Sequence, residues 1–228
     1  LELRDRLRGV QDIQVVAFPQ SGLLVRPGTL DLMEAALRAG ADLVGGIDPS
    51  VIDRDPVGHM DAVFGLATRF GRPIDIHLHE AGELGAYALD LLIERTRANG
   101  MAGQVTASHA FCLGEVARAP AVYEALAEAG IAIATTAPAS RPVPAMRAAR
   151  AAGVRIFTGN DGIRDTWTPY NTPDMLQRAM IVGLKNDLRR DDEIAMAFSM
   201  ITDWAAEACG FERCGLTPGE RADLVLVE

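Results

Sequence analysis

The residues best suited to chemistry in this chain are three of its four histidines and the carboxylates near them. His77, His79 and Glu80 end one apolar run, His109 ends a second, and Asp161 follows a third. Imidazole nitrogens and carboxylate oxygens are common ligands of zinc and ferrous iron, and a carboxyl group beside such a site can carry a proton. The set therefore predicts a site that holds a metal ion and activates water.

Individual roles follow from position. His77 is the expected metal ligand, because it ends a strand beside a second histidine and a glutamate. Asp161 could complete the metal shell and accept a proton from water. His109 is expected either to bind metal or to donate a hydrogen bond to the oxygen of a tetrahedral intermediate. His79 suits a ligand, a proton carrier or a substrate contact, and Glu80 suits an acid and base. Each residue could instead have a purely structural role. The histidines could be hydrogen-bonded without binding metal, Glu80 could lie at a helix N-terminus, and Asp161 could form an Asx turn.

Three other polar or aromatic residues suit a flat heterocyclic ligand. Gln20 ends an apolar run, and its amide offers a donor and an acceptor to the amide edge of a nucleobase-like ring. Trp167 could flank such a ring, and Asn160 lies at the same strand end as Asp161. Alternatively, Gln20 is a polar residue at the rim of the barrel, and Trp167 only packs against its neighbours. The remaining histidine, His59, is expected to be structural or on the surface.

These residues follow the ends of a repeated strand–helix pattern. The predicted strands are Gln14–Gln20, Asp42–Asp48, Pro73–His79, Gln104–His109, Ile131–Thr136 and Val154–Asn160. Most are continuous apolar runs, which predicts parallel strands buried on both faces. The helices predicted between them are Leu30–Ala39 (capped by Thr29), Asp61–Phe70, Ala86–Asn99, Val122–Ala129 and Pro144–Ala152. A glycine follows each helix, as is typical of helix ends, so the pattern indicates consecutive βα units.

After Asn160 the pattern changes. Two longer helices are predicted over residues 174–186 and 191–209, with no strand between them. Residues 216–227 predict a turn followed by a new strand. We therefore expect an incomplete β/α barrel over residues 1–215 and the start of a small β-region over residues 216–228.

The fold class is α/β, and the strand-end residues favour a TIM-like (β/α)8 barrel over an open doubly wound sheet. The carboxyl ends of barrel strands form the active-site face, and polar residues follow four or more of these strands. No glycine-rich phosphate-binding motif follows any strand, as a nucleotide-binding sheet would require. Six units are two fewer than a closed barrel has, so two N-terminal units are expected to be missing.

Composition excludes several classes of protein. The net charge of −9 argues against a nucleic-acid partner, and no apolar run approaches the roughly 20 residues of a membrane span. The three cysteines include no C-x-x-C pair, which predicts reduced thiols in the cytoplasm. The chain begins without methionine, so we expect a fragment or a trimmed chain.

Four segments of the chain resemble a known protein family. The three most specific are Ile74–His77, Val105–His109 and Gly159–Trp167, and the weaker one is the closing segment Gly219–Val225. Over nearly the whole chain they resemble the cytosine deaminase-like branch of the amidohydrolase superfamily. That resemblance implies a (β/α)8 barrel with one catalytic zinc or iron ion. It also implies that this chain holds strands three to eight, without the strand that carries a His-x-His pair.

The resemblance implies a role for each matching residue. His77 and Asp161 match metal ligands, and Glu80 matches the acid and base that carries a proton from water to the ring. His109 matches the histidine that polarises the attacked centre or steadies hydroxide. Gln20 matches the glutamine that pairs with a pyrimidine, and Trp167 matches the tryptophan that lines the pocket.

Two departures from the family pattern bear on the substrate. At the fifth strand, the pattern that resembles cytosine deaminases is His-x-Asp-Glu, whereas this chain has His79 in place of the aspartate. After Asp161, this chain has Gly162 where the family usually has a second aspartate. Both changes resemble triazine-degrading members of the branch, although those have aspartate in place of Glu80. The only lysine, Lys185, lies on a late predicted helix, so it cannot bridge two metals as a carbamylated lysine.

The sequence therefore predicts a metal-dependent hydrolytic deaminase or amidohydrolase. It would cleave a C–N bond of a nucleobase-like or triazine ring with water activated by one divalent zinc or iron ion. We expect a small heterocyclic substrate, a homo-oligomer, no membrane partner, and little metal or activity in these 228 residues alone. Two alternatives stay open: a non-catalytic truncated barrel that binds a small ligand or a partner chain, and a cyclic amide hydrolase. A serine hydrolase is disfavoured, because no G-x-S-x-G segment is present.

Overall fold

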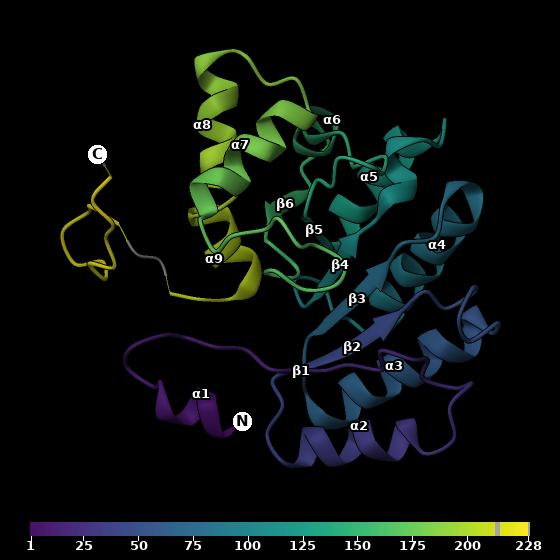
Figure 1. Cartoon of the computed structure of the whole chain (residues 1–228). Helices are drawn as coiled ribbons and strands as arrows, with labels where there is room; N and C mark the ends of the chain where they lie inside the picture. The colour runs from purple at the N-terminus through teal and green to yellow at the C-terminus, as the bar shows by residue number, and fades with distance from the viewer. Residues whose placement is uncertain (213–214, 228) are drawn as a thin grey trace.

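One parallel sheet of six strands forms the centre of the molecule (Figure 1). The computed structural model describes residues 1–212 and 215–227. The strands are β1 (Val16–Ala17), β2 (Leu43–Ile47), β3 (Ile74–Leu78), β4 (Val105–His109), β5 (Ala132–Thr135) and β6 (Arg155–Thr158). Each strand pairs with the one that follows it in the chain, so the spatial order is the chain order. A doubly wound sheet reverses its strand order, so this order confirms the predicted barrel type, here with six strands of the eight in a closed barrel.

Helices connect the successive strands as predicted, and further helices precede β1 and follow β6. They are α1 (Glu2–Arg6), α2 (Thr29–Arg38), α3 (Pro56–Phe70), α4 (Gly82–Ala98), the 3-10 helix η1 (Phe111–Gly114), α5 (Ala119–Ala129), α6 (Met146–Ala151), α7 (Met175–Lys185), α8 (Asp191–Ser199) and α9 (Asp203–Cys209). All five glycines expected after helices have positive φ angles, which side chains other than glycine rarely adopt. The prediction of consecutive βα units is therefore confirmed.

The five helices between the strands start at other residues than predicted, and capping explains two of these differences. Helix α3 begins at Pro56 rather than Asp61, because the side chain of Asp55 accepts a hydrogen bond from the Gly58 N–H. Thr29 is the first residue of α2 and not its cap, since Gly28 occupies the capping position in a left-handed conformation.

The single helix predicted over residues 191–209 is wrong, because the structure has two helices, α8 and α9. The chain leaves the helical conformation at Thr202. Just before this break, the carbonyl oxygen of Met200 accepts a hydrogen bond from the N–H of Thr158 in β6, at 3.0 Å. The break lets α9 lie along β6 instead of continuing the line of α8.

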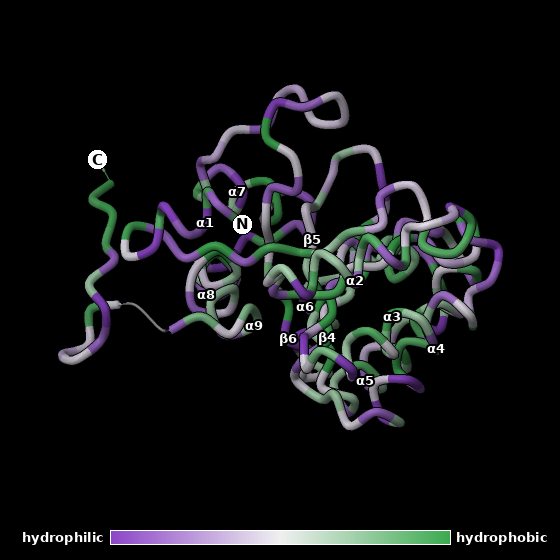
Figure 2. Tube along the Cα trace, turned by 90° about the horizontal axis from the view of Figure 1, so that it is seen from below, coloured by the Kyte–Doolittle hydropathy of each residue, from purple (hydrophilic) through white to green (hydrophobic). Residues whose placement is uncertain are grey.

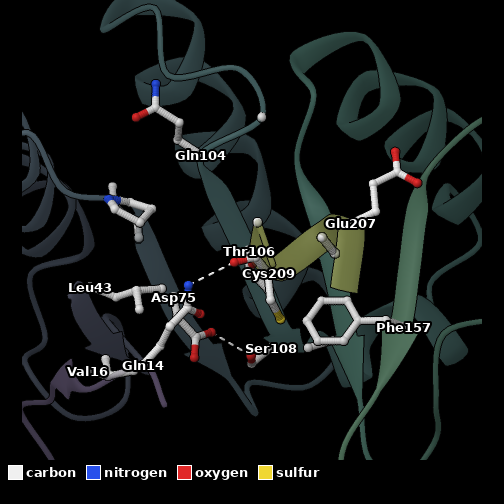
Figure 3. A pocket seen from close by; sticks show the side chains of 16 residues that line it. Gln14, Val16, Leu43, Asp75, Gln104, Thr106, Ser108, Phe157, Glu207 and Cys209 are labelled. Atoms are coloured by element: carbon white, nitrogen blue, oxygen red, sulfur yellow. Dashed lines mark hydrogen bonds between the residues drawn. The ribbon is translucent and has the colours of Figure 1, made fainter. Parts of the chain in front are cut away.

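The two faces of the sheet have different environments. In β3, Ile74 and Ile76 are buried against the helices, whereas Asp75 and His77 face the other side and are half-buried. The prediction that the strands are buried on both faces is therefore wrong for β3. The inner face borders a cavity of about 400 Å³, which Figure 3 shows with Phe157 of β6 at its wall.

His59 is a structural residue, as predicted, but it lies in the core and not on the surface. It is fully buried in α3, with its Nδ1 2.7 Å from Oδ2 of Asp53. The same carboxylate accepts hydrogen bonds from three consecutive backbone N–H groups, at residues 23–25. The pair therefore ties the loop after β1, which carries Gln20, to the start of α3.

The C-terminal segment shows the predicted turn but not the predicted strand. The Glu220 N–H donates to the carbonyl of Thr217 at 3.1 Å, and Arg221 makes a single bridge. Residues 222–227 have no strand structure, and Figures 1 and 2 show this segment extending away from the sheet. The division at residue 215 stays a prediction. None of the described helices combines the length and the hydropathy needed to cross a membrane.

Candidate metal centre

Three histidines meet at the carboxyl ends of β3 and β4. One ring nitrogen from each of His77, His79 and His109 lies within 4.8 Å of the others. Nδ1 of His77 is 3.1 Å from Nε2 of His109, and the rings of His79 and His109 have centroids 4.3 Å apart. The sequence prediction placed these three residues at strand ends, and the structure brings them together.

The backbone of His109 explains how it reaches this cluster. Ser108 faces the inside of the sheet, where its Oγ donates to Oδ1 of Asp75 at 2.6 Å. Alternation along a strand would send the next side chain to the opposite face. His109 instead has φ of 70°, which turns its ring back toward His77. Positive φ is uncommon outside glycine, and such backbone strain clusters at functional sites.

Asp161 lies at the rim of the cluster. Its Oδ2 is 4.0 Å from Nε2 of His109, and its φ is also positive, at 64°. The preceding residue, Asn160, accepts a hydrogen bond from Nε of the buried Arg178 at 3.0 Å. Asn171 donates to the carbonyls of Asn160 and Gly162, so the segment around Asp161 is held from both sides. A substrate contact of Asn160 stays a prediction.

Asp48, at the end of β2, has a contact that the sequence pattern did not predict. Its Oδ1 accepts from the His79 N–H at 2.6 Å, and its Oδ2 accepts from His79 Nδ1 at 2.8 Å. Because the carboxylate is bound to Nδ1, Nε2 of His79 is the nitrogen available to the cluster. The only signal in the sequence was the strand-end position of this aspartate.

Asp75 supports His77 from inside the sheet. Its Oδ2 is 3.6 Å from Nε2 of His77, while its other oxygen accepts from Ser108, as Figure 3 shows. A carboxylate behind an imidazole sets the orientation and the basicity of that ring. Phe18 also contacts His77, with ring centroids 4.7 Å apart, and it too was not predicted.

Electrostatics keep part of the cluster neutral. Burial, helped by the nearby charges of His77 and His79, lowers the pKa of His109 to about 3. Burial alone would also lower the pKa of His77, but Asp75, Asp161 and Asp48 outweigh it, so that pKa is raised. Nδ1 of His109 is buried and has no hydrogen-bond partner among the described residues. The nitrogen of His109 that faces His77 and Asp161 is the other one, Nε2, and a neutral imidazole there fits a zinc or ferrous ligand.

Glu80 lies next to these residues in sequence, but its carboxylate points elsewhere. It is buried, and Oε1 accepts from the N–H groups of Ser50 and Val51, both at 2.7 Å. Burial raises its pKa, and Oε2 has no partner among the described residues. Its described hydrogen bonds join it to the loop after β2 and not to the three histidines. Its role as acid and base stays a prediction.

Two of the three predicted substrate-binding residues are not part of this cluster. Gln20 and Trp167 are both exposed, and neither lines the cavity of about 170 Å³ beside His77 and His109. Their substrate contacts stay predictions. Lys185 ends α7 and donates to the carbonyl of Ala139, so the chain's one lysine lies on a helix, as predicted.

Comparison with known proteins gives matches over almost the entire chain. The model of a family described as "Amidohydrolase family" matches residues 4–228. The chain is 34% identical over 233 residues to N-isopropylammelide isopropyl amidohydrolase of Pseudomonas sp. (strain ADP), covering 100% of this chain and 57% of that protein.

Solved structures of related enzymes also match this chain. The N-isopropylammelide isopropylaminohydrolase of Burkholderia multivorans is 56% identical, with a TM-score of 0.94 over 97% of this chain and 57% of that one. The 5-methylcytosine deaminase of Klebsiella pneumoniae, liganded with phosphonocytosine, is 27% identical with a TM-score of 0.85, covering 97% and 58%. The chain thus spans somewhat more than half the length of the proteins it matches.

Proposed function

This chain belongs to the amidohydrolase family, and we propose that it forms the metal-binding part of a hydrolase that cleaves an exocyclic C–N bond of a heterocyclic ring. The observation that carries this proposal is the meeting of three histidine nitrogens within 4.8 Å at the carboxyl ends of parallel strands. The 56%-identical relative is named for an N-alkylated aminotriazine, and the 27%-identical relative for a pyrimidine. An N-alkylammelide is therefore the first substrate class to test, and a cytosine-like ring is the second.

The residues that would hold the metal are His77 and Asp161, with His109 beside them. His109 is neutral and buried, and the Asp161 carboxylate lies at the solvent-facing rim, 4.0 Å from it. When bound, a divalent metal lowers the pKa of water to about 7, so that hydroxide exists at neutral pH. The choice between zinc and iron belongs to this proposal, since imidazole and carboxylate ligands suit both.

His79 is the residue that we assign to proton transfer. Its side chain is 37% exposed, against 22% for His77 and 4% for His109, so it is the member of the cluster most accessible to substrate. Asp48 holds Nδ1, which leaves Nε2 free to take a proton from water and deliver it to the ring or the departing amine. Asp48 would then stabilise the imidazolium that forms in between.

The test uses two proteins: the 228-residue chain, and the extended chain, in which the N-terminal part of the Burkholderia multivorans relative precedes the same residues. Both are loaded with zinc or ferrous iron and incubated with N-alkylammelides, ammelide, cytosine, isocytosine and creatinine-like rings. We expect amine or ammonia release by the extended chain and little by the 228 residues alone. Ring opening without amine release would indicate a cyclic amide hydrolase. Metal and ligand binding without turnover would favour a non-catalytic barrel.

An Asp48→Asn variant of the extended chain is expected to lower kcat by about 10- to 100-fold while retaining its metal. The amide can donate to Nδ1 of His79, which allows the proton to move to Nε2 and blocks the nitrogen that faces the cluster. The measurement is kcat beside metal content by elemental analysis. Asp42→Asn is the matched control, because Asp42 precedes the same strand and binds Arg4 instead. Equal losses in both variants would contradict the assignment.

We also place this chemistry in the cytoplasm. Cys112 and Cys209 have no disulfide partner among the described residues, and Cys214 lies outside them. Burial raises the pKa of Cys112 to about 12 and that of Cys209 to about 11, so both are protonated at neutral pH. Free, unreactive thiols are typical of reducing compartments.

A further inference from the structure

Arg178 of α7 is a buried cation that has no carboxylate partner among the described residues. It is only 4% exposed. Its Nε donates to Oδ1 of Asn160 at 3.0 Å, and its Nη1 donates to the carbonyl of Thr136 at 2.6 Å, so both partners are neutral. Burial lowers the pKa of its guanidinium, and the charge of Asp161 acts against that shift. Burying a charge without an ion-pair partner is costly, so this is an unusual place for an arginine.

The two partners of Arg178 lie just beyond the point where β5 and β6 stop pairing. The last paired residues are Thr135 and Thr158, and the Gly159 N–H then donates to the Thr135 carbonyl at 3.3 Å. Beyond Gly159, the described hydrogen bonds that join the two segments both come from Arg178. A guanidinium is planar and presents its donors in fixed directions, so it suits a bridge between two acceptors. Arg178 therefore extends the link between these strands past the end of the sheet.

The segments that Arg178 joins form one wall of the candidate site. Thr136 and Asp161 both line the cavity of about 170 Å³ beside the histidine cluster. Asp161 directly follows Asn160, and its φ of 64° is uncommon for a residue other than glycine. Such a conformation persists only where surrounding contacts hold it. The contacts of Asn160 therefore bear directly on where the Asp161 carboxylate lies.

Among the contacts of Asn160, the bond from Arg178 is the strong one that comes from a packed helix. Asn171 donates to the Asn160 carbonyl at 3.0 Å, but it belongs to the same loop as Asp161 and moves with it. The bond from Nδ2 of Asn160 to Sδ of Met175 is long, at 3.6 Å, and sulfur is a weak acceptor. Arg178, by contrast, lies on α7, which packs beside β6 (Figure 1). It therefore ties the loop to the core.

We propose that Arg178 is a positioning residue that acts through Asn160 to hold the Asp161 carboxylate toward the histidine cluster. This inference rests on the proposed function, in which Asp161 is a metal ligand. Without the bridge from Arg178, the segment after β6 is free to move away from β5, and Oδ2 of Asp161 is no longer kept 4.0 Å from Nε2 of His109. Metal binding would then also have to order this segment, which weakens the affinity.

The first test is a double-mutant cycle on the zinc affinity of the extended chain, measured against a chromophoric chelator. Arg178→Met keeps an apolar stem of similar length but removes every donor. We expect it to weaken zinc binding about 10- to 100-fold, as is usual for residues that orient a metal ligand. In an Asp161→Ala background the same change should have an effect of less than about twofold. Equal weakening in both backgrounds would show that Arg178 only stabilises the fold, and would overturn the proposal.

Arg155→Met is the matched control. Arg155 lies at the amino end of β6, where its Nη2 donates to the Gly130 carbonyl at 2.7 Å, so the variant removes an arginine–carbonyl bond of the same kind away from the site. Its zinc affinity should equal that of the unchanged chain. Arg178→Lys keeps the charge but not the two fixed donors, so we expect it to bind zinc at least about threefold more weakly than the unchanged chain. Full affinity in Arg178→Lys would show that the charge acts and not the bridge.

The second test needs no metal and uses the 228-residue chain itself. In crystal structures of Arg178→Met and Arg155→Met, the distance between Oδ2 of Asp161 and Nε2 of His109 is compared with the present 4.0 Å. We expect it to lengthen by at least about 1 Å in Arg178→Met alone, a displacement that matters at a catalytic site. An unchanged distance would overturn the proposal. Failure of the unchanged extended chain to bind zinc would instead contradict the proposed function, and this distance would still decide the role of Arg178.

Discussion

A His77→Ala variant of the extended chain is expected to lose amine release by at least about 1,000-fold. Metal-ion catalysis supplies several kcal/mol, and each 1.36 kcal/mol corresponds to a factor of about ten in rate. His77 is central to the cluster, since its two ring nitrogens lie 3.1 Å from His109 and 3.6 Å from Asp75. Removing its ring leaves Oδ2 of Asp75 without its partner and the metal without a nitrogen ligand. Turnover is measured beside the zinc content of the purified protein.

The fourth histidine provides a matched control for this variant. His59→Gln removes an imidazole of the same kind, but His59 pairs with Asp53 in the core and contributes no nitrogen to the cluster. We expect its zinc content per folded molecule to equal that of the unchanged protein. On the 228-residue chain, zinc affinity measured against a chromophoric chelator should weaken at least about tenfold in His77→Ala alone. Unchanged affinity would remove His77 from the metal site.

The second large effect is expected for His79→Gln, which should lower kcat by about 100- to 10,000-fold in the extended chain, the range typical of general acid–base catalysis. Glutamine keeps a polar side chain near Asp48 but cannot carry a proton. The metal should be retained, because His77, His109 and Asp161 are unchanged. The pH profile of kcat separates the two roles, since the loss of a titrating group flattens one limb, whereas the loss of a metal ligand lowers the whole curve.

Glu80→Gln decides between the two candidate proton carriers. Family resemblance assigns proton transfer to Glu80, whereas the structure binds that carboxylate to the Ser50 and Val51 N–H groups. We expect Glu80→Gln to keep more activity than His79→Gln. Near-complete loss in Glu80→Gln with near-normal turnover in His79→Gln would return the role to Glu80. It would also require the Glu80 side chain to leave the loop during the reaction.

The strands and their order were predictable, because each apolar run is a local feature. Val105–His109 and Ile74–Leu78 are strands in the structure, and their pairing in chain order follows from the barrel type that the strand-end residues favoured over a doubly wound sheet. The ends of the helices were less predictable. The break at Thr202 follows closely after Met200, whose carbonyl accepts a hydrogen bond from the Thr158 N–H, far away in the chain.

The histidines of the candidate site could be identified from the sequence, but their partners could not. His77, His79 and His109 are marked by residue type and strand-end position alone. The contacts of Asp48 with His79 join residues on different strands, and nothing local to either residue encodes that contact. For the same reason the sequence could not indicate that the Glu80 carboxylate turns toward the loop at residues 50–51.

By itself the sequence determined the class of fold, the family and the three histidines, because periodicity, strand-end position and residue type are properties of short segments. Only the tertiary structure decided which nitrogen of each histidine faces the cluster and which carboxylate holds it. It also decided that Leu176, Met180 and Leu184 of α7 are exposed, whereas their spacing in the sequence is the one expected of side chains that face the core. These outcomes depend on how separate strands and helices lie in space, and strand register and the positive φ angles of His109 and Asp161 set that arrangement.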